Sequence, residues 1–150
     1  MADVVQYVSF VLSKEKYAID IMSVEEILRK IDITPVPNAP SFIEGIVNIR
    51  GKVIPVVDLK KKLNIGLSND DGNVRIVITN LRNKRVGFLV DSVEEVVRID
   101  KSIIEQAPAL SVNVDSDYIS GVAKTEKGMI ILLDINKIFS PQEQAGFAGF

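Results

Sequence analysis

The sequence predicts an all-β fold, because short apolar runs bounded by turn residues recur along the chain and one hairpin pattern occurs twice. The runs are rich in valine, isoleucine and aromatic residues, which favour strands. Runs of this kind suit the buried strands of a small barrel. The strands expected from them are 4–12, two strands within 46–57 that are joined at residues 50–52, and then 74–79, 86–90, 119–123 and 129–133.

Two pairs of segments repeat in the same order, which favours a duplicated module over chance similarity between two hairpins. The spacing from Gly45 to Asp58 in one copy equals the spacing from Gly121 to Asp134 in the other. The matching pairs are 23–28 with 92–97, each holding two adjacent glutamates, and 42–59 with 118–135.

The polar stretch near 66–73 is the best candidate for the boundary between the two repeats. A chain of 150 residues is long enough for one domain with a substantial core. We therefore expect a single domain over 1–150, with two pseudo-repeated subdomains that can interlace.

One segment, 23–29, fits either a helix or a strand. Val24, Ile27 and Leu28 have helical spacing, but the matching segment 93–99 is rich in β-branched residues. A strand is therefore the prediction for both segments.

Short helices are expected after the matched hairpins. Asp58 can cap one helix, and Asp134 can cap another over 135–139. Residues 140–143 resemble a capping box with proline at the first helical position. Pro55 cannot donate a backbone hydrogen bond, so we expect it at a sheet edge or at a bulge.

Composition narrows the classes of function. The net charge is −2, and nucleic-acid binders are more often basic, so no nucleic-acid partner is expected. Cysteine and histidine are absent, so the usual nucleophile–base pairs and transition-metal sites cannot be built. We expect no catalytic residue, no metal and no cofactor. Carboxylates, lysines and serines remain, and they leave a carboxylate-based hydrolase as the alternative from another class.

Neither membrane insertion nor an export signal is expected. The longest apolar run, 129–133, is far too short to cross a bilayer. Residues 1–6 lack the basic and long apolar regions of a signal peptide. A cytoplasmic location fits these features and the absence of disulfides.

The hairpin at 45–51 carries polar side chains in apolar surroundings. It holds the amide of Asn48 and the guanidinium of Arg50, followed by Gly51. One interpretation is a turn with polar tips. The other is a recognition site, because arginine offers a fixed fork of donors that suits interfaces. The residue types alone leave both interpretations open.

Residues 42–59 resemble the signature of the CheW family, and the resemblance extends from about Val5 to Phe139. It implies a fold of two SH3-like five-stranded β-barrel subdomains packed around a shared hydrophobic core, with short helices. The residues that carry the resemblance are Gly45, Asn48, Arg50, Gly51, Pro55 and Asp58 within 42–59, together with the matching segments 17–21, 24–27 and 86–93.

The same resemblance implies an adaptor without catalysis that couples chemoreceptors, the methyl-accepting chemotaxis proteins, to the histidine kinase CheA. Receptor recognition is expected in the groove between the barrels, and kinase contact along a barrel strand. The matching receptor-binding positions are Val24, Glu26, Ile27, Gly45 and Arg50, the matching kinase-binding positions are Val74, Arg75 and Ile76, and the motif residues are Asn48, Arg50 and Gly51.

The expected partners are the cytoplasmic hairpin tip of a chemoreceptor and the regulatory domain of CheA. The chain would work in the cytoplasm, where it is recruited to membrane-associated receptor arrays. The same domain also occurs inside CheA and in CheV. The chain leaves no room for a kinase domain and nothing in it resembles a receiver, so the free-standing adaptor is the prediction.

Two expectations concern the glutamates. Glu26 and Arg50 should form an exposed ion pair that orients the guanidinium for receptor contact. The adjacent glutamates at 25–26 and 94–95 should point to opposite faces of their strands, which excludes a general acid/base dyad and leaves solvated or ion-paired roles.

Overall fold

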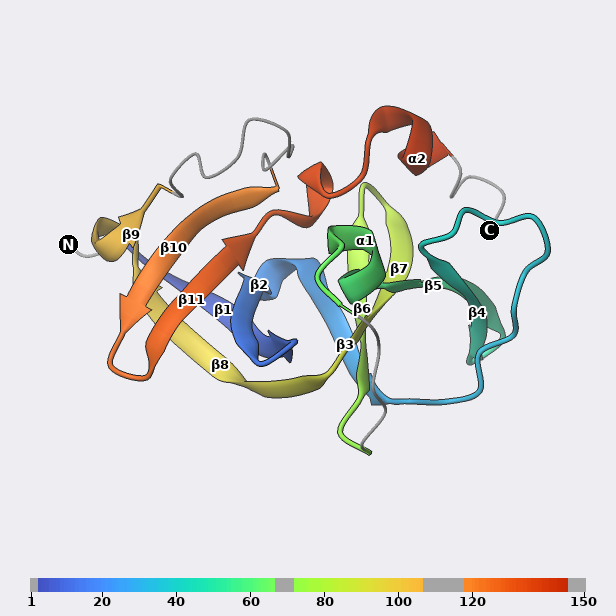
Figure 1. The fold of residues 1–150 in the computed structure, drawn as a ribbon, viewed down its shortest axis with the longest axis horizontal. Helices are drawn as coiled ribbons and strands as arrows, with labels where there is room; N and C mark the ends of the chain where they lie inside the picture. The colour runs from blue at the N-terminus through green and yellow to red at the C-terminus, as the bar shows by residue number, and fades with distance from the viewer. Residues whose placement is uncertain (1–2, 67–71, 107–117, 146–150) are drawn as a thin grey trace.

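The computed structural model describes residues 3–66, 72–106 and 118–145, and it confirms the all-β prediction with two sheets that lie side by side (Figure 1). Helices are few and short: α1 (Leu59–Leu63), α2 (Pro141–Ala145) and the 3-10 turns η1 (Ile21–Ser23), η2 (Lys101–Ile103) and η3 (Ile135–Lys137). The six-stranded sheet has the order β8 (Ser92–Asp100), β1 (Val4–Leu12), β2 (Glu15–Asp20), β11 (Gly128–Leu133), β10 (Ile119–Thr125) and β9 (Ile104–Glu105). The five-stranded sheet has the order β3 (Val24–Arg29), β6 (Arg75–Leu81), β7 (Lys84–Val90), β5 (Lys52–Asp58) and β4 (Ile43–Ile49).

The ambiguous segment and its repeat partner are both strands, as predicted. They form β3 and β8, and η1 occupies only the residues just before β3. Each sheet is an open ladder within the described residues, since its two end strands are not joined in the strand order. The six-stranded sheet exceeds the expected five strands because of the two-residue β9.

Each sheet draws strands from both halves of the chain. β1 and β2 come early in the chain but pair with β8 and β11, whereas β6 and β7 lie between β3 and β5. The chain crosses from one sheet to the other at η1 and again at Asp91, between β7 and β8. Residues 67–71 of the expected repeat boundary lie outside the described residues, and the division into repeats within a single domain stays a prediction.

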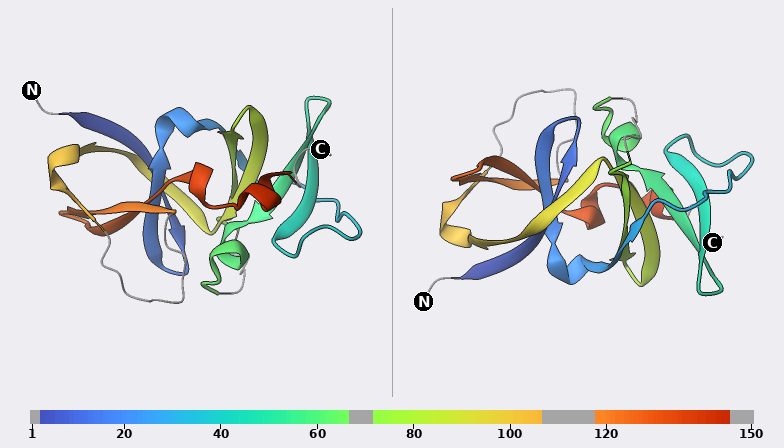
Figure 2. Two further views of the ribbon diagram at one scale, coloured as in Figure 1. Left: turned by 90° about the horizontal axis from the view of Figure 1, so that it is seen from above. Right: turned by 90° about the horizontal axis from the view of Figure 1, so that it is seen from below.

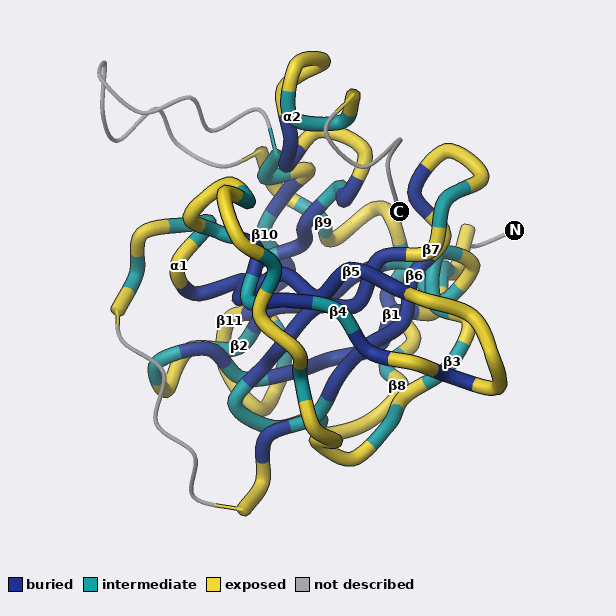
Figure 3. Tube along the Cα trace, turned by 90° about the vertical axis from the view of Figure 1, so that its right-hand side faces the viewer, coloured by how far each residue is buried: buried dark blue, intermediate teal, exposed yellow. Residues whose placement is uncertain are grey.

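Three apolar clusters form the core, and Figure 3 shows the buried strand segments in the middle of the molecule. The largest cluster lies between the sheets and contains Phe10 and Tyr17 from one sheet and Phe88 from the other. A second cluster belongs to the five-stranded sheet and includes Ile76, and a third belongs to the six-stranded sheet and includes Leu132. This arrangement agrees with two β subdomains around a shared core.

Alternation along each strand divides its side chains between two of these clusters. On β7, Val86, Phe88 and Val90 enter the shared cluster, while Leu89 enters the cluster of its own sheet. Gly87 leaves room for the Ile76 side chain, because a Cβ there would lie 2.9 Å from its Cγ2 atom. Burial on both faces explains why the strands read as continuous apolar runs instead of alternating ones.

The segment that holds η3 and α2 runs from the six-stranded sheet to the five-stranded one, as the views in Figure 2 show. Phe139, which lies between η3 and α2, stacks on Phe88 with ring centroids 5.9 Å apart and contacts Phe42 at 5.4 Å. Asp134 caps η3, which ends at Lys137 and is shorter than the helix predicted over 135–139.

The other two predicted caps are confirmed. The Asp58 carboxylate accepts hydrogen bonds from the amides of Lys60 and Lys61 at the start of α1. Ser140 and Glu143 form the reciprocal capping box of α2, with donor–acceptor distances of 2.8 and 3.1 Å.

Pro55 does not lie at a sheet edge, so that part of the expectation is wrong. Its strand β5 is internal, between β7 and β4. Pro55 opposes Ile46 on β4, but the parallel pairing with β7 begins only at Val56. Pro55 therefore precedes the part of β5 that pairs with β7, and its missing amide donor lies outside that pairing. The register shift of β4, between Ile43 and Gly45, lies close to Pro55 without including it.

A partly buried ion pair connects the two sheets at the second crossing. The Lys60 ammonium on α1 lies 3.2 Å from the Asp91 carboxylate, and only 5% of the Lys60 side chain is exposed. Asp91 also accepts a hydrogen bond of 2.8 Å from the amide of Ser13, in the β1–β2 turn. One carboxylate thus joins α1, the β7–β8 crossing and the opposite sheet.

Two glycines at equivalent repeat positions allow a second chain segment to approach a hairpin closely. A Cβ at Gly45 would lie 2.2 Å from the Thr34 carbonyl oxygen, which accepts a hydrogen bond from Ile46. A Cβ at Gly121 would lie 2.5 Å from Ile104 on β9. The isolated Thr34–Ile46 bridge is therefore the counterpart of β9 in the five-stranded sheet.

We expect Gly45→Ala to lower the free energy of unfolding by about 3 kcal/mol, because the new methyl group collides with backbone and the φ of +155° disfavours an L side chain. Gly128→Ala is the matched control, since its φ is also positive and its Cβ would meet open space. It should cost about 1 kcal/mol. Urea unfolding monitored by circular dichroism measures both; equal losses would contradict the close-approach explanation.

Candidate functional site

The polar hairpin tip between β4 and β5 is a two-residue turn held by its own motif residues. Arg50 and Gly51 have φ of 51° and 83°, in the left-handed region that suits the tight turns of twisted hairpins. The Asn48 side chain accepts a hydrogen bond of 2.9 Å from the amide of Gly51. Asn48 and Gly51 therefore shape the turn, and Arg50 projects from its tip.

The adjacent glutamates of β3 lie beside an irregularity in the strand. The register with β6 shifts between Val24 and Glu26, so Glu25 is the extra residue of a bulge. Glu25 forms an ion pair of 2.7 Å with Arg85 on β7, whereas Glu26 reaches the β4–β5 tip. Of the two expected roles, solvated or ion-paired, the ion-paired one holds for both glutamates of this pair.

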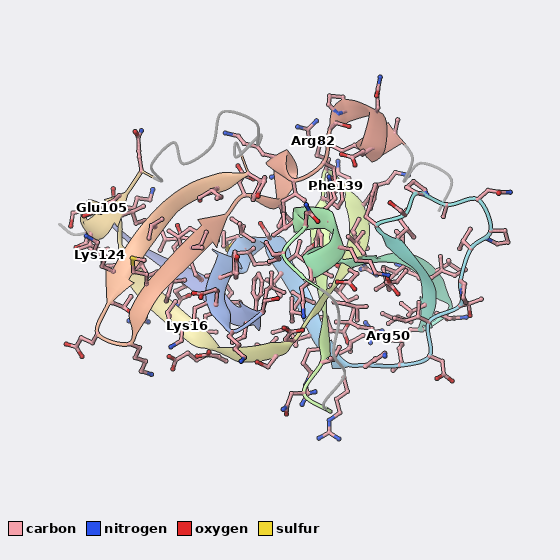
Figure 4. All side chains as sticks on the ribbon, in the orientation of Figure 1. Lys16, Arg50, Arg82, Glu105, Lys124 and Phe139 are labelled. Carbon is pink, nitrogen blue, oxygen red and sulfur yellow. The ribbon has the colours of Figure 1, made fainter. Side chains whose placement is uncertain are left out.

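Glu26 and Arg50 form the predicted ion pair, and it is bidentate. The two terminal nitrogens of Arg50 donate to the two carboxylate oxygens of Glu26, at 3.1 and 2.6 Å. The side chains are 70% and 30% exposed for Arg50 and Glu26, so the pair lies at the surface, as expected. Figure 4 shows Arg50 beside the five-stranded sheet.

The ion pair shifts the pKa values of both groups. Hydrogen bonds from Arg50, and then its charge and that of Arg85, hold the pKa of the Glu26 carboxyl below its ordinary value. The Glu26 carboxylate raises the pKa of Arg50 in turn. Both groups are therefore charged at neutral pH, and the guanidinium is held in one orientation.

The other expected receptor-binding positions differ in their access to a partner. Ile27 follows Glu26 on β3 and is 40% exposed, while Val24 is half-buried against the shared core. Gly45 is buried under Thr34, where it allows the close approach of the two segments, and its part in receptor binding stays a prediction. The structure brings Glu26, Ile27 and Arg50 to one surface.

The expected kinase-binding residues lie on or next to β6, an internal strand. Ile76 is fully buried and Val74 nearly so, both within the cluster of the five-stranded sheet. Ile76 therefore offers no exposed apolar contact, because this face of β6 points into the core, and its assignment to kinase binding stays a prediction. Arg75 is half-buried, and its guanidinium donates to the carbonyls of Val74 and Gly72 at 2.9 and 3.3 Å.

Sequence reasoning missed the groove beside the ion pair. Cationic side chains of Lys52, Lys84 and Arg85 line it together with Glu25 and Val53, around a volume of about 610 Å³. Val53 is half exposed. The sequence does place a cation directly after each of two hairpin turns, Lys52 and Lys84, and this pattern could have predicted the groove. A groove with mostly positive walls suits an acidic partner surface.

The ion pairs of the two glutamate-bearing strands keep their carboxyl groups charged. Within the described ranges, no cluster of three or more acidic side chains is arranged to hold a metal ion. The carboxyl groups of Glu26 and Glu95 have lowered pKa values, caused mainly by hydrogen bonds from Arg50 and Lys127, whereas a general acid needs a raised one. No helix in the described part of the chain is long and apolar enough to cross a membrane.

Removing Arg50 should reduce the shift of the Glu26 pKa. In Arg50→Ala we expect the pKa of Glu26 to rise towards its ordinary value, measured by NMR titration of the side-chain carboxyl. A carboxyl with a lowered folded-state pKa stabilises the fold above its unfolded pKa, and this contribution is lost as pH falls through the folded value. Because the pair is exposed, the melting temperature at neutral pH should fall by about 3 °C or less.

Lys52→Ala is the matched control for this titration, because it removes an exposed cation from the same hairpin. It should leave the pKa of Glu26 low. A Glu26 pKa that responds equally to both substitutions would show a general field effect and contradict the specific pair.

Comparison with known proteins agrees with this geometry. A family model described as a CheW-like domain matches residues 6–143. The chain is 34% identical over 142 residues to the chemotaxis protein CheW of Treponema pallidum, an alignment that covers 92% of this chain and 84% of the relative. It is 37% identical over 137 residues to the chemotaxis protein CheW of Thermotoga maritima, which covers 89% and 86% of the two chains.

A solved structure is similar over almost the whole chain. The crystal structure of the scaffolding protein TtCheW from Thermoanaerobacter tengcongensis matches with a TM-score of 0.84 and 38% sequence identity, and the match covers 95% of this chain and 96% of that one. Since the family model, the relatives and the solved fold agree over nearly the full length, the chain belongs to the CheW family.

Proposed function

We propose that this chain is a chemotaxis adaptor that couples chemoreceptors to the histidine kinase CheA and so supports receptor control of kinase activity. The relatives are named chemotaxis proteins, and the solved member is described as a scaffolding protein. The observation that carries the proposal is the exposed Glu26–Arg50 pair beside a positively lined groove.

The proposed partner of this surface is the cytoplasmic hairpin tip of a chemoreceptor. Glu26 occupies one donor on each terminal nitrogen of Arg50, and the remaining donors are available to a partner. Ile27 adds an exposed apolar contact next to the pair. An oriented arginine beside an apolar side chain is the composition expected of an interface centre.

The proposed kinase contact is the regulatory domain of CheA, bound near Arg75. Because Val74 and Ile76 are buried, contact in this region must use Arg75 and the backbone around it. Receptor contact then uses β3 and the β4–β5 tip, and kinase contact uses the start of β6, where Arg75 lies opposite Arg29 at the end of β3. Simultaneous binding of both partners is part of this proposal.

The adaptor acts without catalysis and without a cofactor in this proposal. A carboxylate-based hydrolase would need a carboxyl group poised to exchange a proton, and the ion-paired Glu26 and Glu95 do not provide one. The function requires a cytoplasmic location, next to the membrane-associated receptor arrays.

Arg50→Ala should bind a soluble receptor-tip hairpin at least about tenfold more weakly than the wild type, because the oriented donor fork is lost. Arg50→Lys should recover only part of the affinity, since an ammonium cannot form the bidentate pair. Titration calorimetry measures both variants, and Lys101→Ala, which removes an exposed cation outside the groove, serves as the charge control. Near-native affinity of Arg50→Ala would reduce Arg50 to a turn residue.

Arg75→Glu should weaken binding of the CheA regulatory domain and leave receptor-tip binding unchanged, because the charge reverses at the proposed kinase contact only. Lys101→Glu is the control, a reversal of an exposed cation on η2, away from both proposed contacts. Separate pull-downs with the receptor tip and with the CheA regulatory domain measure the two binding activities. Loss of both, or of neither, in a folded variant would show that the kinase contact lies elsewhere.

A further inference from the structure

The bulge that presents the glutamates of β3 occurs a second time, on β8. The register between β1 and β8 shifts between Val8 and Phe10, opposite Glu94 and Glu95. Ser9 fills the shift, since its hydroxyl donates to the Glu95 carbonyl at 3.0 Å and accepts from the Glu95 amide at 3.3 Å. Both bulges lie at equivalent positions of the sequence repeat.

The ion pairs of the two bulges also correspond. Glu95 pairs with Lys127 at the β10–β11 tip, with 2.8 Å between nitrogen and oxygen, as Glu26 pairs with Arg50 at the β4–β5 tip. Glu94 lies 3.7 Å from Lys16 at the start of β2, as Glu25 pairs with Arg85 at the start of β7. Each bulge therefore links two hairpins through two ion pairs, in which the bulged strand supplies the glutamate and the hairpin supplies the cation.

Exposed apolar residues follow the same correspondence. Val96 follows Glu95 and is 51% exposed, as Ile27 follows Glu26. On the hairpins, the exposed Met129 occupies the repeat position of the exposed Val53. Exposed large apolar side chains at matching places in both repeats are not explained by packing, because each lies outside the three core clusters.

We propose that the surface formed by Glu94, Glu95, Val96 and Lys127, here called the β8 surface, is a second docking site for a helical hairpin of the receptor-tip class. The inference rests on the proposed function, which gives this class of partner to the β3 surface of Glu25, Glu26, Ile27 and Arg50. A hairpin whose charges complement the glutamates and the tip cation of the β3 surface meets the same signs in the same arrangement at the β8 surface.

The two sites differ in net charge, which sets their order of affinity. The groove beside the β3 surface is lined by three cations and one carboxylate. The groove beside the β8 surface, of about 300 Å³, is lined by three cations, Lys16, Arg98 and Lys127, and by the three carboxylates of Glu94, Glu95 and Glu126. An acidic hairpin therefore binds the β8 surface more weakly and with less dependence on salt.

The sites are separate enough for simultaneous occupancy. Lys16, which pairs with Glu94, and Arg50, which pairs with Glu26, lie on different halves of the molecule in Figure 4. One adaptor molecule can then hold two hairpins at once, which would raise the overall affinity for a clustered set of receptors through an increased effective concentration.

The test is the number of soluble receptor-tip hairpins that the full chain binds, measured by titration calorimetry and sedimentation velocity. We expect two hairpins per chain in the wild type, one tight and one weak. Lys127→Ala and Val96→Glu should each weaken the second site at least about tenfold, whereas Arg50→Ala and Ile27→Glu should weaken only the first. The four side chains are exposed, and circular dichroism checks that each variant is folded.

The outcomes separate this inference from the proposed function. A single site that is weakened by Arg50→Ala, and not by Val96→Glu or Lys127→Ala, keeps the proposed function and overturns the inference. Two sites with the second unaffected by both β8 substitutions also overturn it. No binding in the wild type removes the proposed function, and the inference with it. Capture of the kinase regulatory domain by the β8 surface instead would assign that surface to another partner and overturn the inference.

Discussion

Burial of the cluster between the two sheets is the constraint on which the rest of the structure depends. Phe10 and Phe88 come from different sheets and are both almost fully buried there, and Phe139 joins them from the segment after β11. Since each sheet takes strands from both halves of the chain, neither half can bury its apolar surface without the other. The two subdomains are therefore expected to unfold together.

The partly buried contact between Lys60 and Asp91 links the two sheets at the second crossing. A paired buried charge is weak support for stability, because desolvation of both groups offsets most of their attraction. Its value here is positional, since Asp91 also binds the Ser13 amide across the crossing. Removing either partner would leave an uncompensated charge and weaken the contact between the two sheets.

This rigid frame places recognition residues on strands and tight turns. Glu26 projects from β3 beside a bulge, and Arg50 projects from a turn that Asn48 shapes. Geometry set by strand pairing is more reproducible than geometry set by a long loop. The orientation of Arg50 then follows from the fold and does not require the partner.

Local rules predicted much of this structure. The helix caps at Asp58 and Asp134 and the strand over β3 depend on neighbouring residues or on the repeat, and they are confirmed. The Glu26–Arg50 pair is also confirmed, but its prediction rests on the family positions of the two residues and not on local rules. The error at Pro55 and the unforeseen burial of Ile76 have another origin. Which strand lies beside which, and which face is inside, depends on non-local pairing, and an apolar run buried on both faces carries no alternation to reveal it.

One molecule of this adaptor should hold a receptor tip and the kinase regulatory domain at the same time. Light scattering coupled to size-exclusion chromatography, run on the two partners with and without the full chain, measures this directly. We expect a ternary complex that contains all three components and forms only when the chain is present. Mutually exclusive binding, in which added receptor tip displaces the kinase domain from the chain, would contradict it.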